Sequence, residues 1–329
     1  MKYAKQERLM LFAANAQTIK KGFTWQGPLV KRLAALLYAL DDKPVDCEAI
    51  QASHNLIKNS TGLFSTFKGN MSLSIAAMLS LREDREELFR NTLAVYDMLK
   101  QAKFRASDYL VVAAYQIAAN SPKERHQQAV SSARAFFDAM KARRWFHTGH
   151  DDVIFAAMLG LSGRDPIQGA EKIEQFFQRL KKEFWSGNSV QALSQILVLG
   201  DKCEEAVQHI LDLRDTLRGQ KVRLDKTYTL PALGVLALLP IDGGVLAQDI
   251  LEAQAFLRAQ KGFGAFSVTS QELLLYAAAI ISSSYADGMV NAITTASVST
   301  SIASIIIAQQ MAMISAITAS SAAASAASS

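Results

Sequence analysis

The sequence is poor in the features that mark β-structure and disulfide-stabilised folds. Its 329 residues include only two cysteines, Cys47 and Cys203, which cannot make a disulfide framework and indicate a reducing compartment. No sustained alternation of apolar and polar residues lies beside a hairpin turn signal, so strands are not expected. Residues 1–8 are too charged to lead into the apolar core of a signal peptide. We therefore expect a helical protein of the cytoplasm.

Motifs of catalysis and cofactor binding are also missing. The chain has no Gly-rich phosphate loop and no Gly-x-Ser-x-Gly turn, and neither cysteine lies in a convincing arrangement with histidine. We expect no cofactor, and an enzymatic role is not favoured. The net charge is +5, but its densest patches, residues 141–144 and 179–182, close predicted helices, where cations complement the helix dipole. Nucleic acid is therefore not expected as a partner.

One two-helix unit recurs along the chain roughly every forty residues. Each copy is an amphipathic segment with basic residues at its end, a short break, and then an almost wholly apolar segment. The breaks carry Phe in most copies, for example in residues 21–23, 102–104 and 261–263. Each apolar segment has a small residue near its centre: Ala35, Ala77, Ala114, Ala157, Ser194, Gly234 and Ala278. A constant pattern with variable spacing is typical of a repeat architecture.

The two segments of a unit differ in their expected burial. Residues 166–184 place Ala170, Ile173, Phe177 and Leu180 on one stripe and charged residues elsewhere, as in a helix with one buried face. The segments that follow the breaks, such as residues 153–161 and 230–239, contain no charged residue. A helix that is apolar on all sides is buried on all sides. One helix of each unit is thus predicted to be outer and one inner.

These patterns predict an all-α fold of six to seven antiparallel helix pairs over residues 1–287. The pairs either curl into an α/α toroid or stack as a curved α-solenoid, and the fully apolar inner helices favour the curled form. Asp108, Asp151 and Asn188 stand where the N-caps of inner helices belong.

The C-terminal segment, residues 288–329, contains no charged residue and is rich in Ala and Ser. Its apolar centre has the length of a membrane span, but Gln309 and Gln310 lie in its middle and no Lys or Arg flanks it. We predict a helix docked on the repeat domain, with a frayed end. A membrane or lipid-surface segment is the less favoured alternative.

Polar residues near the starts of the inner helices are the candidate binding site. They are Asp151, Asp152, Asn188, Gln191 and Tyr228. The same residue types are needed for helix capping, so capping is the competing interpretation. A metal site is not expected, although His147 and His150 lie three residues apart beside these aspartates and are weak candidates for ligands.

Four ordered motifs resemble a known family. They are Gly62-Leu63-Phe64-Ser65, the stretch from Phe146 to Asp152, the stretch from Ser186 to Ser194, and the stretch from Ala308 to Ile314. Together they are similar to a bacterial family catalogued as domain of unknown function 4003. The resemblance covers nearly the whole chain and implies a helical protein with no established activity. Gln195 stands where a His is expected from the family, which weakens any metal site on that helix.

A shorter likeness concerns residues 260–266, which are similar to repeats of the prenyltransferase and terpenoid-cyclase toroids. It bears on shape and not on reaction, because the acidic and zinc-binding motifs of those enzymes are missing.

Two functional hypotheses follow. The favoured one is a non-enzymatic binding or scaffold module that holds a protein or peptide. The alternative is a small-molecule-binding protein or enzyme with a pocket at the inner-helix N-termini. A third, weaker hypothesis is membrane association through the C-terminal segment.

Overall fold

The structure is a computed structural model that describes residues 2–63, 65–144, 148–202, 204–290 and 305–317. All regular secondary structure in these ranges is helical, and they contain no strand. The prediction of an all-α fold is confirmed. Residues 64, 145–147 and 203, which include His147 and Cys203, lie outside the described part of the chain.

The helices fall into the two predicted classes. The charge-bearing helices are α1 (Lys2–Gly22), α3 (Cys47–Ser60), α5 (Arg85–Gln101), α7 (His126–Arg143), α9 (Pro166–Leu180), α11 (Ala206–Gly219) and α13 (Gly243–Ala259). The apolar helices are α2 (Pro28–Leu40), α4 (Ser72–Ser80), α6 (Asp108–Asn120), α8 (Asp152–Leu161), α10 (Gly187–Leu199), α12 (Leu230–Ala237) and α14 (Ser270–Val290). Two short 3₁₀ turns are η1 (Thr66–Lys68) and η2 (Lys123–Arg125).

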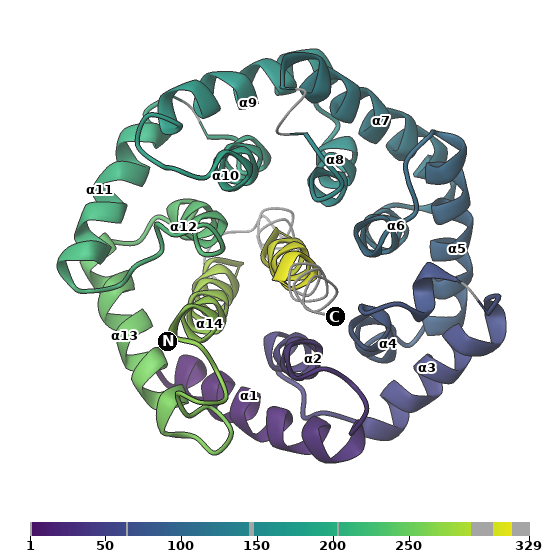
Figure 1. Cartoon of the computed structure of the whole chain (residues 1–329), viewed down its shortest axis with the longest axis horizontal. Coiled ribbons are helices and arrows are strands. Elements are labelled where there is room, and N and C mark those ends of the chain that lie inside the picture. Colours follow the sequence, from purple (N-terminus) through teal and green to yellow (C-terminus); the bar gives the residue numbers. More distant parts are fainter. Residues whose placement is uncertain (1, 64, 145–147, 203, 291–304, 318–329) are drawn as a thin grey trace, which may run out of the picture. The chain divides into compact units, whose positions relative to one another are not determined.

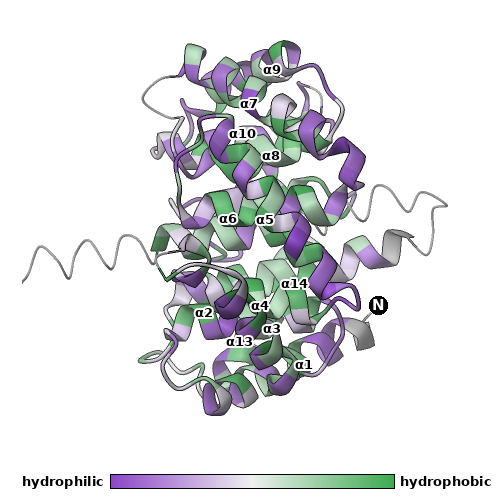
Figure 2. Ribbon diagram, turned by 90° about the vertical axis from the view of Figure 1, so that its right-hand side faces the viewer, coloured by the Kyte–Doolittle hydropathy of each residue, from purple (hydrophilic) through white to green (hydrophobic). Residues whose placement is uncertain are grey.

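Burial follows the sequence pattern in both classes. On α9 the predicted stripe of Ala170, Ile173, Phe177 and Leu180 is buried, while Glu171 and its charged neighbours are exposed. On α8 every residue from Asp152 to Leu159 is buried. In Figure 2 the hydrophobic colour is concentrated on helices of the apolar class, such as α6 and α14. The prediction that the uncharged helices are buried is therefore confirmed.

The chain divides into two compact units, which we describe separately. Unit 1 comprises Met1–Ala13, Ala139–Thr148 and Asp165–Gln309. Unit 2 comprises Ala14–Asp138, Gly149–Arg164 and Gln310–Ser329. The curled or open form of the predicted array stays a prediction.

In unit 1, each charge-bearing helix contacts the apolar helix that follows it: α9 with α10, α11 with α12, and α13 with α14. The apolar helices also pack on one another, α10 on α12 and α12 on α14. In Figure 1, α9, α11 and α13 lie along the outside of this unit and α10, α12 and α14 lie inside it. Both ends of α10 meet the matching ends of α12, because Ser189 bonds to Thr227 and Gly200 abuts Leu238. These two inner helices therefore run in the same direction.

Unit 2 is built in the same way. Helix α3 contacts α4 and α5 contacts α6, while α4 packs on α2 and α6 packs on α8. The Tyr38 hydroxyl, near the end of α2, lies 2.6 Å from the hydroxyl of Ser80, the last residue of α4. At the other end, Gly69, just before α4, abuts Asp108, the first residue of α6. The first turns of α4 and α6 thus lie together.

The start of the chain packs against its last long helices within unit 1. The Phe12 ring of α1 lies 5.3 Å from the Phe263 ring and 5.1 Å from the Tyr276 ring of α14, both edge to face. Lys5 bonds to Asp249 of α13 and to Tyr285 of α14. An ion pair therefore joins α1 to α13, a hydrogen bond and one aromatic contact join it to α14, and the second aromatic contact joins it to the loop between them.

Residues 305–317 form a further helix in the C-terminal segment. Ile305, Met311 and Ile314 in this segment are buried, as are Gln309 and Gln310. Residues 291–304 and 318–329, including the end predicted to fray, lie outside the described residues. Within the described part of the chain, no helix is long and apolar enough to cross a membrane.

Candidate functional site

The five predicted site residues fall in both units. Asp151 and Asp152 belong to unit 2, and Asn188, Gln191 and Tyr228 belong to unit 1. Each group is described within its own unit.

Asp151 and Asp152 are held by the backbone at the start of α8. Asp152 is buried, and its Oδ2 accepts a hydrogen bond of 2.8 Å from the Gly149 amide. Asp151 is half-buried and makes no side-chain capping bond to the helix that it precedes. Burial raises the pKa of Asp151, while the amides of Asp151 and Asp152 and the nearby His150 oppose that rise. The pKa of Asp151 therefore lies above the ordinary value of an aspartate.

A third carboxylate in unit 2, Asp108, is the first residue of α6. Ser107, not Asp108, is the N-cap, since its hydroxyl accepts a 3.2 Å bond from the Leu110 amide. Asp108 makes no hydrogen bond or ion pair with the described residues, and burial raises its pKa. A Cβ placed on Gly69 would lie 2.7 Å from Asp108 Oδ1. A half-buried carboxylate without a counter-charge is costly, which is typical of a functional group.

Two of the three predicted N-caps, Asp108 and Asn188, are therefore wrong by one and two residues. The cap of α6 is Ser107 in place of Asp108, and the cap of α10 is Ser186 in place of Asn188. Asp151 occupies the cap position of α8 without making the bond. The physical reason is local, because a Ser one or two residues before the Asp or Asn is a competing cap and the helix starts at this earlier residue.

In unit 1, Asn188 and Tyr228 lie on adjoining segments. Asn188 is exposed in the first turn of α10, and Tyr228 is half-buried just before α12. Ser189 links the two segments, since its hydroxyl donates a 2.5 Å bond to the Thr227 carbonyl. The structure therefore brings the surroundings of Asn188 and Tyr228 together.

Gln191, by contrast, points into the interior. Gln191 and Gln195 lie one turn apart on α10 and are fully buried, and their Nε2 atoms lie 3.8 and 3.3 Å from Met140 Sδ. The Gln191 Oε1 atom has no hydrogen-bond partner among the described residues. This residue contributes to the polar interior of unit 1 and not to a surface shared with Asn188.

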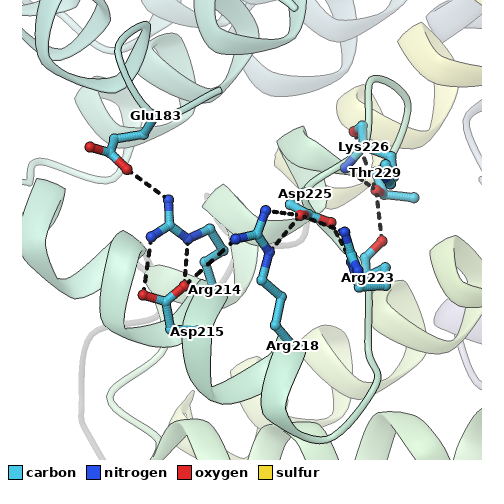
Figure 3. Close-up of polar contacts among 8 residues, drawn as sticks. All are labelled: Glu183, Arg214, Asp215, Arg218, Arg223, Asp225, Lys226 and Thr229. Atoms are coloured by element: carbon cyan, nitrogen blue, oxygen red, sulfur yellow. Dashed lines mark hydrogen bonds and ion pairs between the residues drawn. The ribbon is translucent and has the colours of Figure 1, made fainter. Parts of the chain in front are cut away.

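The segment before α12 is fixed by a charged network (Figure 3). Arg214 donates to Glu183 at 3.0 Å and to Asp215 at 2.8 Å. Arg218 and Arg223 both bind Asp225, at 2.7 and 3.2 Å. Burial acts to raise the pKa of Asp225, but the hydrogen bonds from the two arginines outweigh it and lower that pKa. Because its cations and carboxylates pair with one another, we interpret the network as a brace for the loop that carries Tyr228.

The weak candidates for metal ligands were His147 and His150. His150 is exposed, and His147 lies outside the described residues. Across the ranges that the structure describes, no three His, Cys, Asp or Glu side chains gather as metal ligands would.

A cavity of about 450 Å³ opens in unit 1 beside α9. We call it the α9 pocket; its lining residues are Lys172, Gln175, Phe176, Arg179, Lys202 and Glu204. The first four follow one face of α9, and the last two come from the loop between α10 and α11. The Arg179 guanidinium lies 3.3 Å from Glu204 Oε2. The described lining therefore combines three cationic residues and one carboxylate with Phe176.

Comparison with known proteins assigns the chain to a family. A family model described as "Protein of unknown function (DUF4003)" matches residues 15–311. The chain belongs to the DUF4003 family. This confirms the resemblance drawn from the four ordered motifs.

A relative of this DUF4003 protein is itself uncharacterised. The chain is 22% identical over 220 residues to YeaA, an uncharacterised protein of Bacillus subtilis (strain 168). The match covers 63% of this chain and 64% of YeaA. No solved structure matches the chain.

The α9 pocket is the feature that the sequence interpretation of this DUF4003 protein missed. Lys172 and Arg179 appeared as ordinary residues of a solvated helix face, which is the commonest role of charges on an amphipathic helix. Their spacing with Gln175 puts all three on one face of α9. The other lining residues, Lys202 and Glu204, could not be linked to this helix face from the sequence, because their loop begins more than twenty residues after Arg179.

Proposed function

We propose that this protein is a non-enzymatic binding module that takes its ligand in the α9 pocket. The observation that carries the proposal is the concave site itself, whose volume of about 450 Å³ is in the range of ligand pockets. Its lining combines several charged groups with an aromatic ring, which gives both orientation and apolar contact.

The chemistry of the lining favours binding over catalysis. Among the lining residues that the structure describes, there is no Ser, Thr, Cys or His, the usual nucleophiles and proton carriers of enzyme sites. Its single carboxylate, Glu204, is 78% exposed and paired with Arg179. A nucleophile with an adjacent base, the first requirement of an acyl-transfer or hydrolytic site, is not among these groups.

A fragment screen by protein NMR tests the proposal. Anionic, cationic and neutral compounds are added to the labelled protein, and shifts of backbone amides locate the sites. We expect hits to shift amides of α9 and of residues 202 and 204, and to be recovered unchanged. Hits that leave these amides unshifted, or a compound that is chemically converted, would contradict the proposal.

A second candidate function is small-molecule binding at the inner-helix starts of unit 2. Asp108 favours it, because burial raises its pKa and no described residue neutralises it. A ligand ammonium or hydroxyl would supply the missing donor.

Asp108→Asn provides the test of this second function. Burial raises the pKa of Asp108 in the folded state, so the protonated carboxyl carries no penalty below the ordinary pKa of an aspartate. As the pH rises through the raised value, ionisation of the buried carboxyl destabilises the fold. We therefore expect Asp108→Asn to raise the melting temperature at pH 7 and to lose this gain toward pH 3. A variant less stable than the native protein at pH 7 would assign Asp108 a structural role.

A further inference from the structure

The α9 pocket has an excess of positive charge. Lys172, Arg179 and Lys202 face a single carboxylate, Glu204. Lys172 is exposed and makes no hydrogen bond or ion pair with the described residues. Lys202 is half-buried, and its Nζ lies 3.5 Å from the Leu238 carbonyl at the end of α12. Uncompensated cations around one cavity raise the local concentration of anions.

The pocket also has an apolar component. Phe176 is part of its lining and only 4% exposed, so most of the ring packs into the core and the remainder faces the cavity. The lysine and arginine stems add further apolar surface beneath their charged ends. A bare inorganic anion would leave this surface uncovered, whereas an anion joined to an apolar group would cover it.

The ion pair inside the pocket is weakly held. Arg179 Nη1 lies 3.3 Å from Glu204 Oε2 and 3.4 Å from the Glu204 carbonyl oxygen, both long for a charge-assisted bond. The two side chains are 48% and 78% exposed, and exposed pairs of this kind contribute little to stability. Replacement of Glu204 by another anion as the partner of Arg179 therefore costs little free energy.

We propose that the α9 pocket binds an organic anion with an apolar body, and that the ligand's anionic group replaces Glu204 as the partner of Arg179. Lys172 and Lys202 flank the same charge, and Phe176 contacts the apolar body. Glu204 acts as an internal substitute for the ligand in the empty pocket. This inference rests on the proposed function and names its ligand class. The anion is carried by a free compound or by an acidic side chain beside an apolar one in a peptide.

Calorimetry with small probes tests the ligand class. The probes are phenylacetate and phenyl phosphate. Phenylacetamide is the control that lacks the charge, and inorganic phosphate is the control that lacks the apolar body. We expect both phenyl anions to bind at least about tenfold tighter than either control compound, since one charge-assisted bond is worth about tenfold in affinity. Equal binding of phenylacetamide and phenylacetate would overturn the proposal.

Variants test the exchange at Arg179. Arg179→Met should weaken phenylacetate binding about tenfold, while Glu204→Gln should strengthen it because the competing carboxylate is gone. Lys182→Met is the matched control, an exposed lysine just after α9 that does not line the pocket, and it should have no effect. The proposal is wrong if Glu204→Gln weakens binding, or if Lys182→Met matches Arg179→Met.

Calorimetry with a peptide that has adjacent Glu and Phe tests whether a partner chain supplies the anion. Its control peptides replace Glu by Gln or Phe by Ala. Binding that needs both side chains supports the same chemistry on a partner chain. Fragments that shift the pocket amides while all these anions fail would reject the ligand class and leave the proposed function intact. If neither anions nor any fragment shift those amides, both are rejected.

Discussion

Single residues decide how closely the apolar helices approach one another. A Cβ on Gly160 of α8 would lie 2.7 Å from the Ala133 nitrogen and 2.8 Å from the Ala129 carbonyl oxygen of α7, both backbone atoms. A Cβ on Gly234 of α12 would meet the end of the Leu193 side chain at 2.6 Å. Backbone atoms move far less readily than the end of a leucine, so the two glycines differ in what they tolerate.

The first prediction concerns these two positions. Gly160→Ala should destabilise the protein by about 1–3 kcal/mol through overpacking, although alanine is the better helix former. Gly234→Ala should be close to neutral, because Leu193 can adjust and the gain in helix propensity, about 1 kcal/mol, offsets the strain. Gly234→Leu should cost about 2–3 kcal/mol, since the larger side chain cannot be accommodated.

Chemical denaturation measures these differences. The control is Gly219→Ala, at the end of α11, where a Cβ has nothing within 4 Å and stability should not fall. If Gly160→Ala and Gly219→Ala behave alike, the close approach of α7 and α8 is incorrect.

The residue scale also shows where sequence reasoning succeeds. Gly234 and Ala157 stand near the centres of segments predicted to be inner helices, and both are buried. Gly160 was missed, because at the end of its segment it was indistinguishable from a residue that ends a helix. Which of two adjacent polar residues caps a helix, as with Ser107 and Asp108, depends on backbone angles that composition does not encode.

At the scale of elements, α1 is tied to α13 and α14 by a small polar cluster. Lys5 donates to Asp249 and, at 2.8 Å, to the Tyr285 hydroxyl, which in turn donates to Asp249 at 2.5 Å. The Lys5 and Asp249 side chains are 12% and 19% exposed. Removal of one partner from such a shielded pair leaves the other charge poorly solvated, which destabilises the fold.

The second prediction follows from the pKa of Lys5. Burial acts to lower this pKa, but the bonds to Asp249 and Tyr285 outweigh it and raise the pKa above 10.5. The contribution of Lys5 to stability is therefore fully present below about pH 10 and is lost as the pH rises through the raised value. We expect the stability gap between the native protein and Lys5→Met to be constant from pH 7 to 9.

Denaturation at several pH values checks this expectation, and the gap should narrow above pH 10.5, the ordinary pKa of lysine. Lys20→Met, an exposed lysine of the same helix, is the control and should show no gap. A gap for Lys5→Met that is unchanged at pH 11 would show that the loss comes from packing alone.

The C-terminal segment supplies the third prediction. Ile305, Ile306 and Ile314 are each 1% exposed, so residues 305–317 contribute to the apolar core. A chain cut after Asp287 should have a melting temperature several degrees lower, because each buried apolar side chain is worth about 1.5–3 kcal/mol. We expect the intact protein to remain in the supernatant without detergent. Partition of the intact protein with membranes, together with an equally stable truncated form, would make the segment an anchor.

The elements themselves were largely predictable from the sequence. The uncharged segments 153–161 and 230–239 correspond to buried helices α8 and α12, since an all-round apolar pattern leaves no other solution. The charge network of Arg214, Arg218 and Asp225 was not predictable, because it joins residues whose proximity depends on the loop before α12.

At the scale of the molecule, the sequence predicted the fold class and the family but not the α9 pocket. The predicted site residues were selected as polar groups at helix starts, and Asp152 and Gln191 are buried there. The α9 pocket is formed by a helix face and a loop from the next helix pair. A site assembled between pairs requires their packing, which periodicity within one helix does not contain.

A crystal structure of the protein soaked with phenylacetate tests the central claim most directly. We predict density for the ligand in the α9 pocket, with its carboxylate within hydrogen-bond distance of Arg179, its ring against Phe176, and Glu204 turned away. An α9 pocket that stays empty at saturating phenylacetate, with the Arg179–Glu204 pair intact, would contradict the account.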